Sequence, residues 1–231
     1  MIRICMLLFI FWGGQLFAQN ARQQLVDNAA REYLSNAGNQ STLYYGKEQE
    51  GYQRTINHPY LIDQQHVKAR LSYGGVVYPE VMLRLDLFRD ELIVLSPFFR
   101  NIVLVPENVD LAEMYDRRII YFRKDSLPGC PSSGYCTLLH SGKYKVLERQ
   151  TNRLTHNDRS EFYYYMSTSF YLYKDDAYYI IRNQRGLLKA LGTHKKELKR
   201  FISSNRLQFR DNPETFLIKT VNEYENLILS P

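Results

Sequence analysis

The sequence predicts a mainly β protein of the α+β class: a curved antiparallel sheet, as a half-barrel or a sandwich, with helices at its C-terminal end. Three observations predict this fold. Between residues 41 and 183, apolar and polar side chains alternate with a period of two in many short segments. Turn-forming pairs such as Gly74-Gly75 separate these segments and favour hairpins. From residue 184 to residue 231, the apolar spacing changes to that of helices.

Residues 1–18 have the features of a cleavable signal peptide. Arg3 supplies the positive start, Ile4 to Trp12 form an apolar run, and Leu16-Phe17-Ala18 ends in a small residue suited to cleavage. The run is shorter than the roughly 20 residues that span a bilayer, which disfavours the alternative of an uncleaved membrane anchor. No cysteine directly follows the run, so the signal lacks a lipobox. We therefore expect a periplasmic or secreted protein without a lipid anchor.

The chain after the signal divides into three parts. Residues 19–40 form an N-terminal segment, in which the apolar spacing over 21–36 favours a helix. Residues 41–183 form the antiparallel β domain, and residues 150–160 within it are polar enough to predict a long surface loop. The strands are expected at 69–73, 76–78, 81–88, 91–95, 101–105, 110–115, 118–123, 135–140, 143–149, 162–173 and 177–181.

Residues 184–231 are expected to form a helical segment that packs on the sheet, because an apolar helix stripe must be buried against another element. The spacing predicts a short helix over 186–191 and a second one over 193–204, with Thr193 as its N-cap. Asn212-Pro213 predicts the start of a third helix, since proline suits the first helical turn.

The composition disfavours several classes of protein. The formal charge of +6 falls to +5 once the single cation of residues 1–18 is removed, which is milder than a nucleic-acid-binding surface requires. No segment after residue 18 is apolar enough to cross a membrane as a helix. There is no glycine-rich phosphate loop, and we expect no cofactor. The five histidines share no metal-ligand spacing, so no metal site is predicted: His58, His66, His140, His156 and His194.

Two cysteines, Cys130 and Cys136, remain after cleavage of the signal. They bracket the turn-rich stretch Pro131-Ser132-Ser133-Gly134, and an oxidising compartment favours a disulfide between them. Two free thiols or half of a metal site are the alternatives. A reduced cysteine with His140 as its base would be a nucleophile, which we consider the weaker interpretation.

No catalytic residue is predicted. Three pairs of carboxylates are available to a hydrolase: Glu48 with Glu50, Asp86 with Asp90, and Asp175 with Asp176. Asp86 alternates away from the leucine face of its strand, and we expect it to be solvated beside Arg84. A basic helical face, His194-Lys195-Lys196 with Lys199-Arg200, is interrupted by Glu197 and is expected to be solvated. Its alternative role is to bind an anionic envelope polymer or lipid head groups.

The most unusual feature is an aromatic-rich strand, since nine of the residues from 162 to 179 are aromatic. Period-two alternation places Phe170 and Leu172 on one face, which we assign to the core. The candidate binding residues are the tyrosines of the other face: Tyr163, Tyr165, Tyr171 and Tyr173. Such a face can stack and form hydrogen bonds with a glycan, peptide or lipid. We favour the alternative of a purely structural role, in which the C-terminal helices cover this tyrosine face.

Three stretches of the mature chain carry a resemblance to a known group of proteins. They are Leu43–Glu48 with His58–Tyr60, then Gly75–Tyr78 with Leu85–Leu87 and Asp90–Val94, and finally Phe170–Ile181 with Leu187-Leu188, Lys195–Leu198 and Phe201. The pattern resembles a family of exported Bacteroidota proteins with no known activity. The resemblance implies export from a Gram-negative cell and implies no chemistry.

These observations predict an exported, non-enzymatic protein of the cell envelope with a binding or structural role. Its expected partner is a lipid, a glycan or an envelope protein held on a face of the sheet. The alternative is a hydrolase of envelope polymers that uses carboxylates in a cleft.

Overall fold

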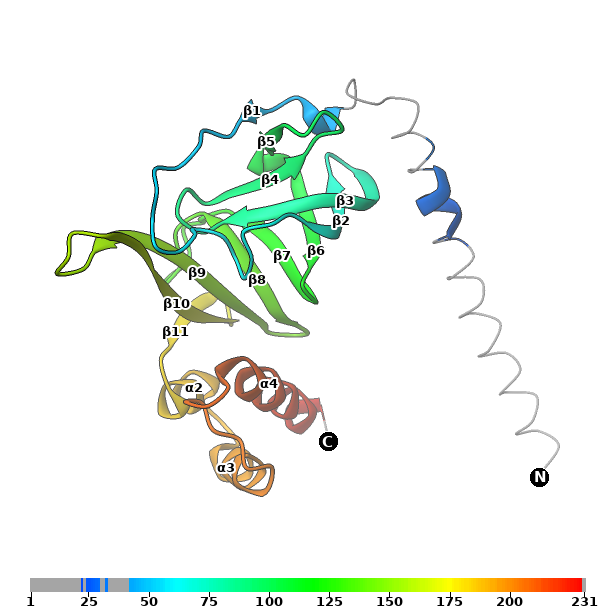
Figure 1. The fold of residues 1–231 in the computed structure, drawn as a ribbon. Coiled ribbons are helices and arrows are strands. Elements are labelled where there is room, and N and C mark those ends of the chain that lie inside the picture. The colour runs from blue at the N-terminus through cyan, green and yellow to red at the C-terminus, as the bar shows by residue number, and fades with distance from the viewer. Residues whose placement is uncertain (1–21, 23, 30–31, 33–41, 230–231) are drawn as a thin grey trace.

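The computed structural model of the chain describes residues 22, 24–29, 32 and 42–229 (Figure 1). The predicted signal peptide, residues 1–18, lies outside the described residues. Of the helix predicted over 21–36, the described residues are helical and the others lie outside the description. Asp27 in this segment forms an ion pair of 2.9 Å with Arg70 of the sheet.

The prediction of a mainly β fold with a curved antiparallel sheet is confirmed. Within residues 42–229, eleven strands form one antiparallel sheet that does not close, in the order β1-β5-β4-β3-β2-β6-β7-β8-β9-β10-β11. The strands are β1 (Lys47–Glu48), β2 (Val67–Tyr73), β3 (Val76–Asp86), β4 (Glu91–Leu95), β5 (Asn101–Val103), β6 (Val109–Met114), β7 (Arg117–Phe122), β8 (Gly134–Ser141), β9 (Lys145–His156), β10 (Phe162–Lys174) and β11 (Ala177–Ile181). Short 3₁₀ turns lie at Thr42–Tyr44 and Pro106–Asn108.

Two hairpins have the turns that the sequence predicts. Gly74 and Gly75 join β2 to β3 with φ angles of 58° and 78°, a region that glycine enters without steric cost. Asp175 and Asp176 join β10 to β11 with φ angles of 49° and 52°. Aspartate is among the few other residues that tolerate this region. Both turns keep consecutive strands adjacent in the sheet.

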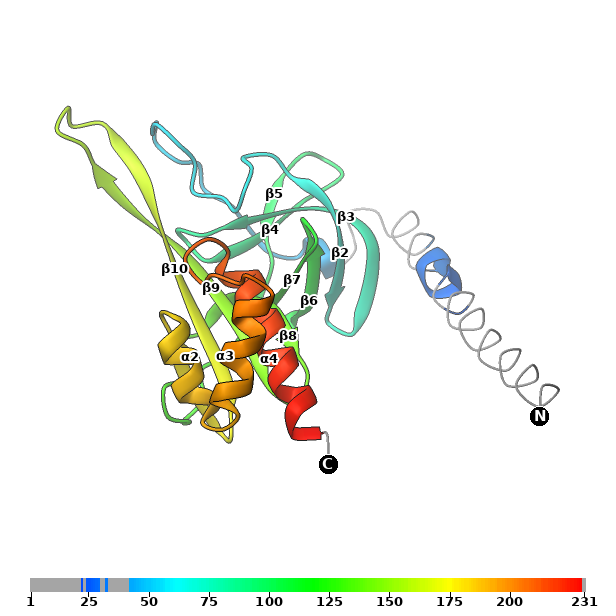
Figure 2. The same ribbon diagram turned by 90° about the horizontal axis from the view of Figure 1, so that it is seen from below.

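The long loop predicted over residues 150–160 is wrong. β9 continues to His156 and pairs with β10 in unbroken register as far as His156 opposite Phe162. Figures 1 and 2 show this two-stranded ribbon extending beyond the rest of the sheet. Much of its outer half is exposed, so the sequence carries no alternation of apolar and polar residues there, and the usual signal of a strand is missing.

The sheet buries two main apolar clusters. Strands β2 to β8 curl around the larger one, which contains Leu71, Tyr78 and Leu83 (Figure 1). The smaller one joins the end of the sheet at β9 to β11 to the C-terminal helices, through residues such as Phe170 and Leu172. Because the two clusters lie at different ends of one continuous sheet, the helices do not cover the curled part.

The C-terminal helices are α2 (Gln184–Leu191), α3 (Lys195–Ser204) and α4 (Pro213–Leu229). α2 contacts β10 and β11, α4 contacts β8, and α3 packs on α4 on the side away from the sheet (Figures 1 and 2). α4 begins as predicted, with the Asn212 side chain accepting from the Thr215 N–H at 2.8 Å. No helix in the described part of the chain is long and apolar enough to cross a membrane.

The prediction that Thr193 caps α3 is wrong. The N-cap position is His194, which has a φ of 51° and makes no capping hydrogen bond through its side chain. The Thr193 hydroxyl instead lies 3.1 Å from the Tyr224 hydroxyl of α4. The Thr193 side chain is therefore engaged by α4, and the first turn of α3 receives no side-chain cap from its N-cap residue.

Candidate functional site

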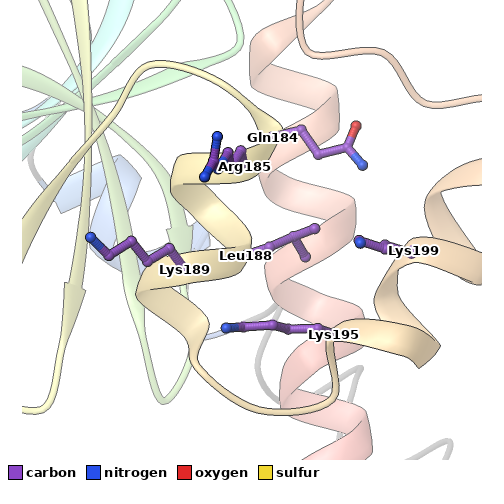
Figure 3. A pocket seen from close by; sticks show the side chains of 6 residues that line it. All are labelled: Gln184, Arg185, Leu188, Lys189, Lys195 and Lys199. Atoms are coloured by element: carbon purple, nitrogen blue, oxygen red, sulfur yellow. The ribbon is translucent and has the colours of Figure 1, made fainter.

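A basic pocket of about 690 Å³ opens between α2 and α3 (Figure 3). Its lining residues are Gln184, Arg185, Leu188, Lys189, Lys195 and Lys199. Figure 3 shows Lys195 and Lys199 reaching from α3 toward α2, with Leu188 facing them, whereas Lys189 points away from α3. Leu188 is buried in the helical core and fixes the floor of the pocket.

Four cationic side chains line this basic pocket without a carboxylate partner. In the described part of the chain, none of Arg185, Lys189, Lys195 and Lys199 forms an ion pair. Glu197 lies on α3 but does not line the pocket. Like charges held together raise the local positive potential, and the uncapped start of α3 adds the partial positive charge of a helix N-terminus. The arrangement is suited to an anionic group.

Local sequence explains why the cations of each helix lie together. Arg185 and Lys189 are four residues apart on α2, and Lys195 and Lys199 are four residues apart on α3, so each pair shares one face of its helix. Gly192 has a φ of 86° and ends α2 sharply, so only three residues separate α2 from α3. The sequence interpretation identified the basic residues of α3 and missed those of α2. Their spacing of four residues was the available signal.

The candidate tyrosines divide into two groups. Tyr171 and Tyr173 are half-buried: Tyr171 packs against the cluster of Phe122, Cys136 and Leu147, and the Tyr173 hydroxyl donates to Asp176 at 2.8 Å. Tyr165 is 54% exposed and Tyr163 is half-buried, and both lie on the outer half of the β9–β10 ribbon. The structure therefore does not gather the four tyrosines into one open surface.

The expectation that the C-terminal helices cover the tyrosine face is wrong. The helices pack against Phe170 and Leu172, on the opposite face of β10. The tyrosine face is covered near Tyr171 and Tyr178 by the loop that contains Pro128 and Cys130. The face of β10 that we assigned to the core is therefore buried, and the C-terminal helices are the elements that cover it.

The prediction of a disulfide between Cys130 and Cys136 is wrong, because both are free cysteines in the structure. Cys136 points from β8 into the apolar cluster with Phe122, while the Cys130 sulfur accepts from the Asp125 N–H at 3.3 Å within its own loop. Burial raises the pKa of Cys136 to about 11, and burial also raises the pKa of Cys130. Raised pKa values keep both thiols protonated, whereas a nucleophile needs the thiolate.

Asp86 is fully buried, which corrects the expectation that it is solvated. Its Oδ1 atom accepts from the backbone N–H groups of Phe88 and Arg89, each at 2.9 Å. Its Oδ2 atom accepts from the Gln49 amide at 3.1 Å and from the Tyr52 hydroxyl. Burial and the contact with Asp86 raise the pKa of Tyr52. A carboxylate with four donors is an anchor for the chain rather than a free acid or base.

The segment that Asp86 anchors is residues 49–66, which we name the strap. The strap contributes Leu61 to the larger core, and it also contacts Arg84 of β3, whose guanidinium lies 3.9 Å from the centre of the Tyr60 ring. Arg84 also donates to the Gln64 carbonyl at 2.8 Å and to the Gln49 side chain at 3.0 Å. A polar pocket of about 420 Å³ is lined by residues 52–60 and Gln64 of the strap.

His66 at the end of the strap should make stability depend on pH. Burial, and secondarily the charge of Arg84, lower its pKa from 6.5 to about 4. Between these values the unfolded chain binds a proton that the folded chain does not, so folding loses stability as the pH falls from about 6.5 toward 4. We expect the urea midpoint to fall less between pH 7 and pH 5 in His66→Gln than in the wild type. An equal fall in both proteins would contradict the assignment.

Most of the remaining candidate carboxylates form ion pairs or belong to a turn, and the histidines form no metal site in the described residues. Asp90 pairs with Arg149 at 3.0 Å and accepts from the Tyr135 N–H at 3.1 Å. Asp175 and Asp176 form the β10–β11 turn, and Glu50 pairs with Lys47 at 3.4 Å on the exposed start of the sheet. In residues 22, 24–29, 32 and 42–229, no group of three or more histidine, cysteine or acidic side chains is placed to hold a metal ion.

An ionic cluster joins the sheet to α4. Arg117 at the start of β7 contacts Glu148 of β9 at 2.6 Å and Glu214 of α4 at 2.8 Å. The Glu148 side chain is only 2% exposed, and burial raises the pKa of Glu148 despite its partner Arg117. Sequence reasoning missed this cluster, because its three members are far apart in the chain.

The comparisons with known proteins leave the family open. No protein-family model, no curated protein and no solved structure matches this chain. The resemblance to exported Bacteroidota proteins therefore stays a prediction.

Proposed function

We propose that the protein is an exported, non-catalytic binding protein of the cell envelope, and that the basic pocket between α2 and α3 holds an anionic group of its ligand. The observation that carries the proposal is the set of four cations around one pocket with no carboxylate partner in the described chain. The signal-like residues 1–18 support export.

The chemistry of the basic pocket favours a phosphate or carboxylate group. Lysine amines donate from several directions to a compact anion, and the arginine guanidinium can form two parallel bonds with it. Leu188 adds an apolar floor, which suits a ligand with both a charged group and a hydrocarbon or sugar body. The four cations are exposed, so salt screens their attraction and binding should weaken as ionic strength rises.

The test is calorimetric titration of the full chain with three anionic probes: inorganic phosphate, linear polyphosphate and dihexanoyl phosphatidylglycerol. Dihexanoyl phosphatidylcholine, which has no net charge, is the neutral comparison. We expect the double variant Lys195→Glu/Lys199→Glu to weaken binding of the anionic probes by about tenfold or more, since each exposed charge contributes up to ~1 kcal/mol. Preference for polyphosphate indicates a polymer ligand, and preference for phosphatidylglycerol indicates a lipid.

The matched control is Lys196→Glu/Arg200→Glu, which makes the same change of charge on the same helix. Both residues are exposed and neither lines the basic pocket. Binding through the pocket requires the control to retain most of its affinity. Equal losses in both double variants would show a diffuse basic surface, and no binding of any anionic probe by the wild type would overturn the proposal.

A further inference from the structure

The outer edge of β10 is covered at both ends and open between them. In an antiparallel ribbon, the backbone groups of alternate residues point to opposite sides of a strand. The even-numbered residues of β10 point away from β9: the Phe162 carbonyl accepts from the Ile56 N–H at 2.9 Å, and the Tyr164 N–H donates to the Asn57 side chain at 2.7 Å. From Phe170 onward, β11 covers this edge. The stretch from Tyr165 to Ser169, which we name the notch, lies between these two covers.

Met166 and Thr168 direct the backbone of the notch outward. The register of β9 and β10 is continuous through this stretch, so no bulge reverses the alternation. The N–H and C=O groups of both residues have no protein partner in the described chain. The side chains are exposed as well, since Tyr165 is 54% and Met166 is 52% exposed. The notch thus offers two donors and two acceptors in line.

The neighbouring edges show how this chain covers a strand when it does so. Beside the notch, the Asn57 side chain takes the place of a strand residue: its amide donates to the Tyr164 carbonyl at 2.8 Å and its oxygen accepts from the Tyr164 N–H at 2.7 Å. On β11, the Tyr178 N–H donates to the Pro128 carbonyl at 2.8 Å. Natural edges are otherwise protected by charged residues or proline, and the notch contains neither.

We propose that an extended segment of another polypeptide adds to β10 along the notch as a short strand. Five residues of strand span about 17 Å, which fits a peptide of about five residues. Its backbone would bond Met166 and Thr168 in the way that Asn57 bonds Tyr164. Successive peptide side chains would contact Tyr165 on one face and Met166 on the other, which favours two adjacent apolar residues.

The geometry favours a flexible peptide over a second copy of this chain. If the notches of two copies paired antiparallel, each β10 would run on past both ends of the partner's notch. It would then meet β11, which pairs from Phe170 onward, and the strap residues opposite Phe162 and Tyr164. A short peptide whose two ends leave the plane of the sheet avoids contact with both β11 and the strap. The site is separate from the basic pocket and does not depend on it.

The experiment selects phage-displayed random heptapeptides on the full chain and measures the affinity of the synthetic winners by fluorescence anisotropy. Thr168→Pro removes one outward N–H and leaves the ladder to β9 intact, because that ladder uses the odd-numbered residues. We expect this change to weaken peptide binding by tenfold or more. The control Thr168→Val keeps the N–H and the branched shape, and it should bind as the wild type does.

Amide exchange measured by NMR keeps the test valid even if Thr168→Pro fails to fold. In the wild type, we expect the Met166 and Thr168 amides to exchange fast and to become protected by at least tenfold on peptide binding. The proposal is overturned if no peptide binds more tightly than millimolar, or if bound peptide protects other amides instead. Concentration-dependent dimers that Thr168→Pro abolishes would overturn it in favour of a second copy.

Discussion

Replacing Arg117 by alanine is expected to lower the free energy of unfolding by about 3–5 kcal/mol, because it leaves a buried charge without its partner. Arg117 contacts Glu148 at 2.6 Å, and the Glu148 side chain is 2% exposed. The same arginine contacts Glu214 at 2.8 Å, so its loss also weakens the attachment of α4 to the sheet. Urea unfolding followed by far-ultraviolet circular dichroism measures the change.

The neighbouring arginine provides the control for this prediction. Arg118 is exposed on the same strand, opposite Glu113, and Arg118→Ala should change stability by less than about 0.5 kcal/mol. Adding Glu148→Gln to Arg117→Ala removes the uncompensated charge and should restore part of the loss. A cost for Arg117→Ala below about 1 kcal/mol would show that Glu148 is solvated or protonated when it is alone.

Replacing Asp86 by alanine is expected to cost about 3–4 kcal/mol, because hydrogen bonds to a charged group contribute about 1.5–3 kcal/mol each and are not additive. The change leaves the backbone N–H groups of Phe88 and Arg89, the Tyr52 hydroxyl and the Gln49 amide without their acceptor. The strap should loosen first, and fast amide exchange or proteolysis within residues 49–66 would report it.

Asparagine at position 86 distinguishes two roles of this carboxylate: it stabilises the turn after β3, and it holds the strap. Asp86→Asn keeps an oxygen for the turn N–H groups of Phe88 and Arg89, but it sets an amide nitrogen against the Tyr52 and Gln49 donors, so an intermediate cost is expected. Asp110→Ala is the control, because Asp110 is exposed and its carboxylate accepts a hydrogen bond from the Ser72 hydroxyl at 3.1 Å on the surface of the sheet. Equal costs for Asp86→Ala and Asp110→Ala would mean that Asp86 does not anchor the strap.

The errors of the sequence interpretation have a common physical origin. Period-two alternation identified the two faces of β10, but it holds no information about which face the helices cover, and the helices lie on the side of Phe170. The same alternation placed Asp86 away from the leucine face, where a solvated residue and a residue under the strap have the same pattern. Asp86 is buried by the strap, whose contacting residues Gln49 and Tyr52 lie 37 and 34 residues earlier in the chain.

The candidate site was likewise only half visible in the sequence. Lys195 and Lys199 form a basic helical face by spacing alone, and local periodicity identifies such a face reliably. Their approach to α2 depends on the turn at Gly192 and on how both helices pack around α4. The sequence gives even less indication of the notch on β10, because whether the edge of a strand is open depends on which other segments pair with it.

The sequence by itself determined the mainly β class, the antiparallel order of neighbouring strands, the turns at Gly74-Gly75 and Asp175-Asp176, and the start of α4 at Asn212. These features depend on side-chain period and on backbone preferences of one or two residues. Only the tertiary structure decided that Asp86 is buried, that Cys130 and Cys136 stay apart as thiols, and that cations of α2 and α3 line one pocket. Each of these depends on which distant segments pack together, and long-range packing leaves no periodic trace in the sequence.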